Sequence, residues 1–288
     1  MEKISFVKMS GAGNDFILID KDNNPAFPLT KNFVVKLCNR RNGVGADGLI
    51  TISNSKDFDF VMEYFNADGS TGSLCGNGAR CAIKFASLSN RIFANTTKFL
   101  SNNVPYSGEV LSENHIKFYF NQPSKLKLNS KIVVHKQEIN SSFIDTGSPH
   151  VVIKIEDVHL IQNEMNSSYS DINDFPVFQL GREIRYLPDF APGGTNVNFI
   201  QIKEGKIFIR TYERGVEDET LACGTGSTAS ALIAFYTENL HPPIKLITRG
   251  GDELTVDFNF AGDSINNLSL TGPAKITFTG EISLNQFL

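Results

Sequence analysis

The sequence has no tryptophan, only four cysteines and five histidines in 288 residues, and no long apolar run. No window approaches the roughly 18 apolar residues of a membrane-spanning helix, so we expect no membrane partner. The 27 basic residues do not outnumber the 31 acidic ones, and the formal net charge is −4. Without a basic excess or stripe, nucleic acid is not the expected partner.

The N-terminus has no apolar segment like that of a signal peptide, which predicts a cytoplasmic location, where thiols stay reduced. The cysteines (Cys38, Cys75, Cys81 and Cys223) are therefore poor disulfide candidates. None forms a CxxC pair, and their spacing does not suit zinc, so no metal site is expected.

Short runs of alternating apolar residues predict half-buried strands at residues 116–120, 207–209, 254–258 and 276–278. Helices are expected at about residues 31–39 and directly after Cys75 and Cys223. Because strands and helices do not alternate regularly, the pattern predicts an α+β fold with antiparallel sheets. The polar residues 163–174 predict a surface loop, and Pro123 lies near a candidate domain boundary.

A short internal repeat divides the chain. Residues 74–79 (LCGNGA) resemble residues 222–227 (ACGTGS), about half the chain later. Each copy follows an aromatic-led strand and precedes an apolar helix. The repeat predicts two similar halves related by a pseudo-twofold axis, with one site in the cleft between them.

The repeated turns carry residues suited to proton transfer. Two glycines before a helix permit a tight turn, and the unpaired amides of the helix start can bind a carboxylate. The same helix terminus lowers a cysteine pKa and favours the thiolate. If Cys75 and Cys223 lie on opposite faces of one substrate carbon, one can remove its proton while the other returns a proton to the opposite face. The configuration of that carbon is then inverted without a metal or a cofactor. Cys38 and Cys81 read as core residues.

With these residues the chain resembles the diaminopimelate epimerase family. The resemblance runs through residues 8–16, 43–48, 65–70, 75–81, 147–150, 194–199, 210–220 and 222–226. It implies that LL-2,6-diaminoheptanedioate is interconverted with the meso form, without pyridoxal phosphate, for lysine and peptidoglycan synthesis. It also suggests a homodimer.

The resemblance further implies two lobes, each a curled, barrel-like antiparallel sheet around a central helix, with the active site in the cleft. Residues 1–121 with 273–288 would form the N-terminal lobe carrying Cys75. Residues 122–272 would form the C-terminal lobe carrying Cys223.

Site roles carry over onto matching positions. Cys75 and Cys223 would be the acid and base, assisted by His150 and Glu213, which would position the substrate ammonium and shape thiol protonation. The remaining substrate contacts would come from Asn14, Asn66, Ser148, Asn196 and Arg214, and from the backbone amides of Gly76, Asn77, Gly224 and Thr225. Arg40, Arg41 and Arg80 read as structural or surface residues. Two positions differ from many family members: this chain has Ser148 where they have Asn, and Gly48 where they have Gln.

Alternatives stay open. A proline or hydroxyproline racemase would share the fold and the paired cysteines, although its first turn usually reads Cys-Gly-His, where this chain has Asn77. A non-catalytic amino-acid-binding module would have no need of two low-pKa thiols. Individually, Asn14, Asn66 and Asn196 could shape turns, and His150 could be an ordinary buried histidine.

Overall fold

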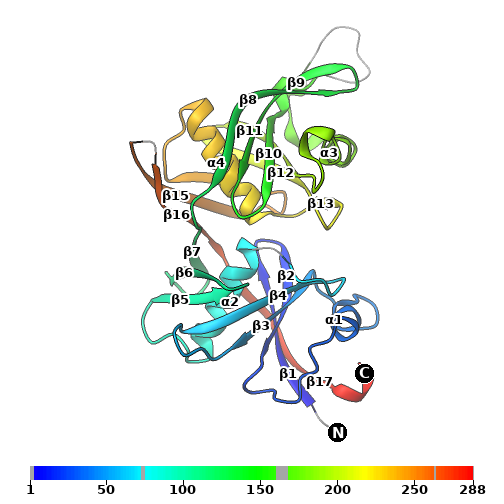
Figure 1. The fold of residues 1–288 in the computed structure, drawn as a ribbon, viewed down its shortest axis with the longest axis vertical. Helices are drawn as coiled ribbons and strands as arrows, with labels where there is room; N and C mark the ends of the chain where they lie inside the picture. The colour runs from blue at the N-terminus through cyan, green and yellow to red at the C-terminus, as the bar shows by residue number, and fades with distance from the viewer. Residues whose placement is uncertain (1–2, 73–74, 160–167, 263, 288) are drawn as a thin grey trace. The chain divides into compact units, whose positions relative to one another are not determined.

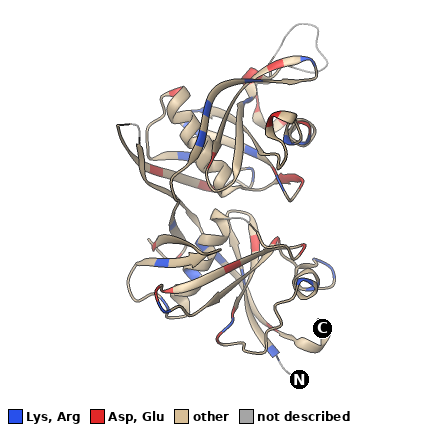
Figure 2. Ribbon diagram, in the orientation of Figure 1, with Lys and Arg blue, Asp and Glu red and all other residues tan. Residues whose placement is uncertain are grey.

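The computed structural model describes residues 3–72, 75–159, 168–262 and 264–287. It has a mixed α/β fold, with strands paired in both directions and, in these residues, four α-helices. The chain divides into two compact units, residues 1–119 with 271–288 and residues 120–270 (Figure 1). None of the helices described is both long and apolar enough to span a bilayer. Acidic and basic residues are interspersed along both units (Figure 2).

The first unit holds two helices and most of the N-terminal strands. Its elements are β1 (Lys3–Gly11), β2 (Asn14–Asp20), α1 (Lys31–Cys38), β3 (Gly48–Ser53), β4 (Phe60–Asn66), α2 (Gly76–Leu88), β5 (Thr96–Ser101), β6 (Val104–Val110), β7 (His115–Tyr119) and β17 (Lys275–Ser283). The positions of the strands and of the helix predicted here are confirmed, because β7, β17 and α1 cover nearly all of the expected residues. The half-burial expected at residues 276–278 is wrong, because Ile276 and Phe278 are 42% and 46% exposed and Thr277 between them is exposed too.

The second unit contains the other two helices. Its elements are β8 (Ser124–Val134), β9 (Gln137–Asp145), β10 (Pro149–Lys154), α3 (Val177–Arg185), β11 (Asn196–Lys203), β12 (Lys206–Glu213), β13 (Asp218–Thr220), α4 (Gly224–Glu238), β14 (Ile244–Ile247) and β15 (Glu253–Ala261); β16 (Ser264–Pro273) leads back to the first unit. The predicted strands at β12 and β15 are confirmed, and helices do follow both Cys75 and Cys223.

Strand pairing repeats between the units. In the first, β1–β2 is antiparallel, β2–β3 parallel, β3–β4 antiparallel, β4–β5 parallel and β5–β6 antiparallel. In the second, the same sequence of directions runs through β9–β10, β10–β11, β11–β12, β12–β14 and β14–β15. The short sequence repeat thus extends to a repeated topology.

The expectation of antiparallel sheets is only partly confirmed, because most of the described strand pairs are antiparallel but some are parallel. Each parallel pair is joined through a helix: α1 links β2 to β3, α2 links β4 to β5, α3 links β10 to β11, and α4 links β12 to β14. Parallel strands need such a crossover, whereas a hairpin suffices for antiparallel ones. Alternation along a strand reports which face is buried and carries no information about the direction of its neighbour.

Two helices lie at the centre of their units. Every residue from Gly76 to Ala86 of α2 is buried, and so is every residue from Gly224 to Ala234 of α4. The α2 helix contacts β1, β2, β3, β4, β6 and β7, and α4 contacts β9, β10, β11, β12, β14 and β15. Strands therefore surround each helix, and its first turn is held rigidly.

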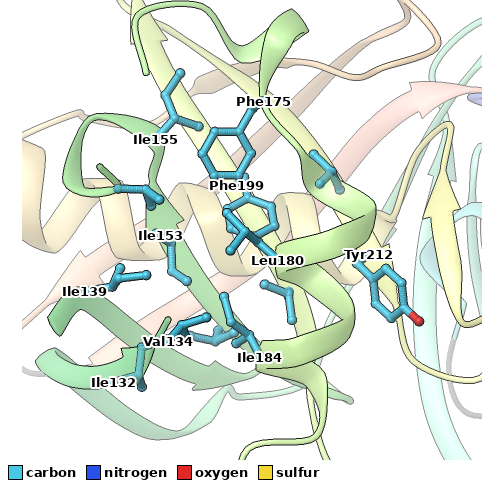
Figure 3. Close-up of a cluster of buried hydrophobic side chains, with 14 of the residues drawn as sticks. Ile132, Val134, Ile139, Ile153, Ile155, Phe175, Leu180, Ile184, Phe199 and Tyr212 are labelled. Carbon is cyan, nitrogen blue, oxygen red and sulfur yellow. The ribbon is translucent and has the colours of Figure 1, made fainter. Parts of the chain in front are cut away.

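The second unit has a core that the sequence analysis partly missed. Leu180 and Ile184 of α3 pack with Phe175, Phe199 and their neighbours (Figure 3). The α3 helix was not predicted, because Gly181 interrupts its apolar spacing. That glycine is needed, since a Cβ there would lie 2.4 Å from the Tyr212 Cβ.

The polar stretch 163–174 is only partly described, because residues 160–167 lie outside the described residues. Beyond them, a 3-10 turn at Ile172–Asp174 places Ile172, 4% exposed, in the core. The expectation of a wholly solvated loop is therefore wrong for this part, where one apolar side chain anchors the segment.

We predict that Phe99→Ala lowers the free energy of unfolding by about 3–5 kcal/mol, because the ring is buried and stacked on Phe60 with centroids 4.8 Å apart. The matched control is Phe93→Ala, whose ring is 95% exposed and should change stability by less than about 0.5 kcal/mol. Urea unfolding of both variants measures the difference. Equal effects would contradict the packing described for β5.

Candidate active site

Both cysteines cap a helix. Cys75 is the N-cap of α2 and Cys223 the N-cap of α4, each with extended backbone angles. The Cys75 Sγ accepts a hydrogen bond from the Gly78 amide at 3.3 Å, and the Cys223 Sγ accepts one from the Gly226 amide at 3.4 Å. A sulfur that accepts amide hydrogens at the positive end of a helix dipole is favoured as the thiolate.

The glycine of the second turn is required by packing. A Cβ at Gly226 would lie 2.3 Å from the Asn198 Oδ1, so any larger residue there would push Asn198 away from its hydrogen bond with Thr211. At Gly78 the nearest atom is the Ile50 Cδ1 at 3.1 Å. The two turns therefore have the same backbone conformation but pack on different side chains. The Cys75 turn packs on an aliphatic side chain, and the Cys223 turn packs on a polar amide.

Behind Cys75 lies a network of amides. Asn77 donates from Nδ2 to the Asn14 Oδ1 at 2.6 Å, and Asn14 donates to the Asp47 Oδ2 at 3.0 Å. The fully buried Arg80 donates to the Asn77 Oδ1 at 3.0 Å and to the Gly76 carbonyl oxygen at 3.3 Å. Arg80 is thus structural, and the Asn77 side chain braces the turn while its backbone forms part of it.

Asn14 is held in turn by a cluster of charges. Asp15 bonds the buried Lys8 at 2.7 Å and the exposed Arg40 at 2.7 Å, and Arg40 also bonds Asp47 at 2.6 Å. Burial raises the pKa of Asp15, but the hydrogen bonds and charges of Arg40 and Lys8 outweigh it and lower this pKa to about 2. The carboxylate therefore stays ionised and keeps the Asn14 segment in place.

Asn66 ends β4 directly opposite Gly48 and donates to the Ser70 Oγ at 3.0 Å. A Cβ at Gly48 would lie 2.6 Å from the Tyr64 ring. The space beside Asn66 is thus filled by Tyr64, a residue that the sequence analysis did not select. The signal that could have found it is the pair of glycines, Gly48 and Gly72, that its ring contacts.

Around Cys223 the structure brings several predicted residues together. The Cys223 Sγ lies 3.4 Å from the Thr225 Oγ1, which the Ser148 Oγ approaches to 3.3 Å. Ser148 in turn lies 2.9 Å from the His150 Nε2, and His150 Nδ1 lies 3.1 Å from the Asn198 Nδ2. Asn198 is a second residue that the sequence analysis did not select, although it lies in the segment 194–199 that carries the resemblance, two residues after Asn196 and on the same face of the strand.

His150 is neutral at physiological pH. Complete burial, and then the positive charge of Arg214, lower its pKa to about 3. A neutral ring acts through the hydrogen bond it donates and not through charge. The Ser148 Oγ lies within hydrogen-bonding distance of its Nε2.

The end of β12 carries the charged candidates. Glu213 accepts from the Thr220 Oγ1 at 3.0 Å, and the Arg214 amide donates to the Asn196 Oδ1 at 2.9 Å. Asn196 also donates to the Pro149 carbonyl oxygen at 2.8 Å. Asn196, Glu213 and Arg214 are therefore held in the same unit as Cys223.

The other two cysteines are core residues, as predicted. Cys38 and Cys81 are buried, and burial raises the pKa of each thiol to about 12. In the part of the chain that the structure describes, no three His, Cys, Asp or Glu side chains are grouped to hold a metal ion.

Comparison with known proteins gives concordant results. The family model for diaminopimelate epimerase matches residues 6–122 and 142–277. The diaminopimelate epimerase of Aquifex aeolicus is 39% identical, over 97% of this chain and 98% of its own. That of Chlorobaculum tepidum is 38% identical, over 96% of this chain and 100% of its own.

Solved structures with little sequence identity share the fold. A PhzF-family phenazine biosynthesis protein of Bacillus anthracis is 14% identical, with a TM-score of 0.70 over 98% of this chain and 100% of its own. A hydroxyproline epimerase of Agrobacterium vitis is 13% identical, with a TM-score of 0.68 over 98% of this chain and 93% of its own.

We predict that brief alkylation of the native protein at neutral pH modifies Cys75 and Cys223 and spares Cys38 and Cys81. A thiol with a pKa of about 12 is thiolate in only on the order of one part in 10⁵ at pH 7. Peptide mass spectrometry measures the four sites in one sample. Modification of Cys81 as fast as Cys75 would contradict the assignment.

We predict that the folded protein loses stability in acid as Asp15 becomes protonated. Its pKa is lower in the folded chain than the roughly 3.9 of an unfolded one. Its contribution is therefore fully present above about pH 4 and is lost as pH falls towards 2. Asp15→Asn should remove on the order of 2 kcal/mol at neutral pH and flatten the decline between these values. Urea unfolding at several pH values tests this, with the exposed Asp57→Asn as control; equal slopes in both variants would refute it.

Proposed function

Because the chain belongs to the diaminopimelate epimerase family, we propose that it inverts one α-carbon of diaminopimelate with Cys75 on one face and Cys223 on the other. Family membership makes the chain an isomerase that acts on diaminopimelate in lysine biosynthesis. The finer proposal is the interconversion of the LL and meso isomers by two thiols, in the cytoplasm, with the product also serving peptidoglycan synthesis.

In the proposed reaction the two thiols carry out both proton transfers. One cysteine thiolate takes the α-proton and becomes a thiol, while the electron pair delocalises into the substrate carboxylate. The other thiol delivers its proton to the opposite face and becomes a thiolate. The net change is an inverted carbon, with the protonation states of the two cysteines exchanged.

Charge that develops on the α-carboxylate requires donors that are already in place. The amides of Gly76, Asn77, Gly224 and Thr225 belong to the first turns of two buried helices, at the positive ends of the helix dipoles. Donors fixed at a helix start stabilise developing negative charge without reorganisation. This is the role we propose for them.

The distal end of the substrate needs partners of both charges. We propose Arg214 for the carboxylate, Glu213 for the ammonium, and Asn66, Asn196 and Ser148 as polar contacts. Asn14, whose amide bonds both Asn77 and Asp47, is suited to hold the first turn in register as well as to border the site. His150 would support the site through Ser148.

We propose that the two lobes, residues 1–121 with 273–288 and residues 122–272, each supply one turn to a site between them. The repeated strand pairing supports this proposal, because two units of the same topology can present equivalent turns through a pseudo-twofold axis. A homodimer is the oligomeric state we propose. The observation that carries the function is that both thiols cap buried helices through the same Cys-Gly-x-Gly turn.

Two other functions remain as outcomes of the test. A proline or hydroxyproline racemase on this fold would accept a smaller substrate with one charged end, which the charged pair Glu213 and Arg214 does not favour. A binding module would retain its function after Cys75→Ser, because helix capping needs no reactive thiol.

The deciding experiment is proton NMR of the reduced enzyme with LL-diaminopimelate in D2O, without cofactor. Loss of the α-proton signal should accompany formation of the meso isomer. Cys75→Ser and Cys223→Ser should each lower inversion by at least ~10²–10⁴-fold, because each removes the acid–base group of one face. Cys38→Ala, which changes a thiol of the core, should retain activity.

Each contrary outcome has a meaning. Racemisation of proline without turnover of diaminopimelate would replace the substrate but keep the two thiols. Full epimerase activity in either serine variant would overturn the two-base proposal.

A further inference from the structure

The two cysteine turns are alike in backbone but differ in the side chains beneath them. Strand register aligns the units: Phe16 pairs with Gly48 on β3 as His150 pairs with Asn196 on β11. In the same alignment Ile50, opposite Tyr64, corresponds to Asn198, opposite Thr211. Apolar and aromatic side chains in the first unit are thus replaced by polar, hydrogen-bonded ones in the second.

The hydrogen bonds among these polar side chains run from donor to acceptor in one direction, starting at Asn198. The Asn198 Nδ2 donates to the Val151 carbonyl oxygen at 2.9 Å, and its Oδ1 accepts from the Thr211 Oγ1 at 3.0 Å. These partners fix the amide orientation, so the nitrogen also faces the His150 Nδ1 as a donor. Because His150 is neutral, its one hydrogen is on Nε2 and is donated to Ser148.

The direction continues to the sulfur. Ser148 accepts from His150, so its own hydrogen is available for the Thr225 Oγ1 at 3.3 Å. Thr225 then has its hydrogen available for the Cys223 Sγ at 3.4 Å. The Gly226 amide donates to the same sulfur. Hydrogen bonds to a charged acceptor are the stronger ones, so this order favours the thiolate at Cys223.

We propose that Ser148 and Thr225 form, with His150 and Asn198, a one-directional hydrogen-bond relay that keeps Cys223 as the thiolate before substrate binds. Ser148 and Thr225 are then positioning residues for the reacting sulfur. In the other turn the residue that corresponds to Thr225 is Asn77, whose amide is bonded to Asn14 and Arg80.

The charged groups near the relay are consistent with this assignment. Arg214, at the end of β12, is close enough to His150 to lower its pKa, and Glu213 beside it is bonded to Thr220. This inference rests on the proposed function and specifies the protonation state of the free enzyme, in which Cys223 is the base. The free enzyme then accepts first the isomer whose α-proton faces Cys223.

The experiment measures the rate of alkylation of Cys223 by iodoacetamide from about pH 5 to about pH 10, read by mass spectrometry of its peptide. Thr225→Val should raise the midpoint of Cys223 by about one pH unit, which is an approximately tenfold loss of thiolate at neutral pH. Thr225→Ser restores a hydroxyl and should keep the original midpoint. Ser148→Ala should shift it upward by a smaller amount.

Two controls separate the relay from a general disturbance. Cys75 in the same sample should keep its midpoint in every variant. Thr228→Val removes a buried hydroxyl of α4 that bonds only the Gly224 carbonyl oxygen among the contacts described, and it should leave Cys223 unchanged. Should Thr225→Val fail to fold, Ser148→Ala tests the same relay.

An unchanged Cys223 midpoint in Thr225→Val or in Ser148→Ala would overturn the proposal. So would an equal shift at Cys75, or a failure of Thr225→Ser to restore the midpoint. Because alkylation needs no substrate, these results are independent of the epimerase assay. A failed relay with intact turnover would leave the proposed function standing.

Discussion

The capping of a buried helix by a cysteine sulfur is the interaction on which this site depends. Cys75 and Cys223 each accept the third amide of the helix that they begin. Capping satisfies a donor that would otherwise lack a partner, and it also holds the sulfur beside the remaining amides of the turn. One contact thus stabilises the helix start and, in the proposed mechanism, would also favour the thiolate and place it beside the amides that would bind a substrate carboxylate.

The rest of each unit keeps that first turn in place. Strands contact α2 and α4 from several sides, and the glycines of the turns leave room for neighbours such as Asn198. Beneath the caps, the units have diverged. The Cys75 turn is braced by the hydrogen bonds of Asn77 and Arg80 and packs on Ile50. The hydrogen bonds of His150, Ser148 and Thr225 lead to the sulfur of Cys223. A repeated fold can thus present two similar turns with unequal chemistry.

The turns and helices of the site follow from local sequence, whereas the strand pairing and some of the site residues do not. The Cys-Gly-x-Gly turns and the helices after them are predictable because spacing and glycine conformation act within a few residues. The parallel pairing of β4 with β5 and of β12 with β14 depends on partners far along the chain, which alternation does not encode. For the same reason Asn198 and Tyr64 were missed, and the neutrality of His150 became evident only with its burial.

Under the proposed mechanism the two thiols act on one carbon, so in the absence of substrate they should be able to form a disulfide with each other. The most direct measurement is mild oxidation of the substrate-free enzyme with diamide, followed by disulfide mapping and assay. We predict a Cys75–Cys223 disulfide that abolishes activity and is reversed by reductant. Retention of both thiols in alkylatable form, with activity unchanged after oxidation, would contradict the account.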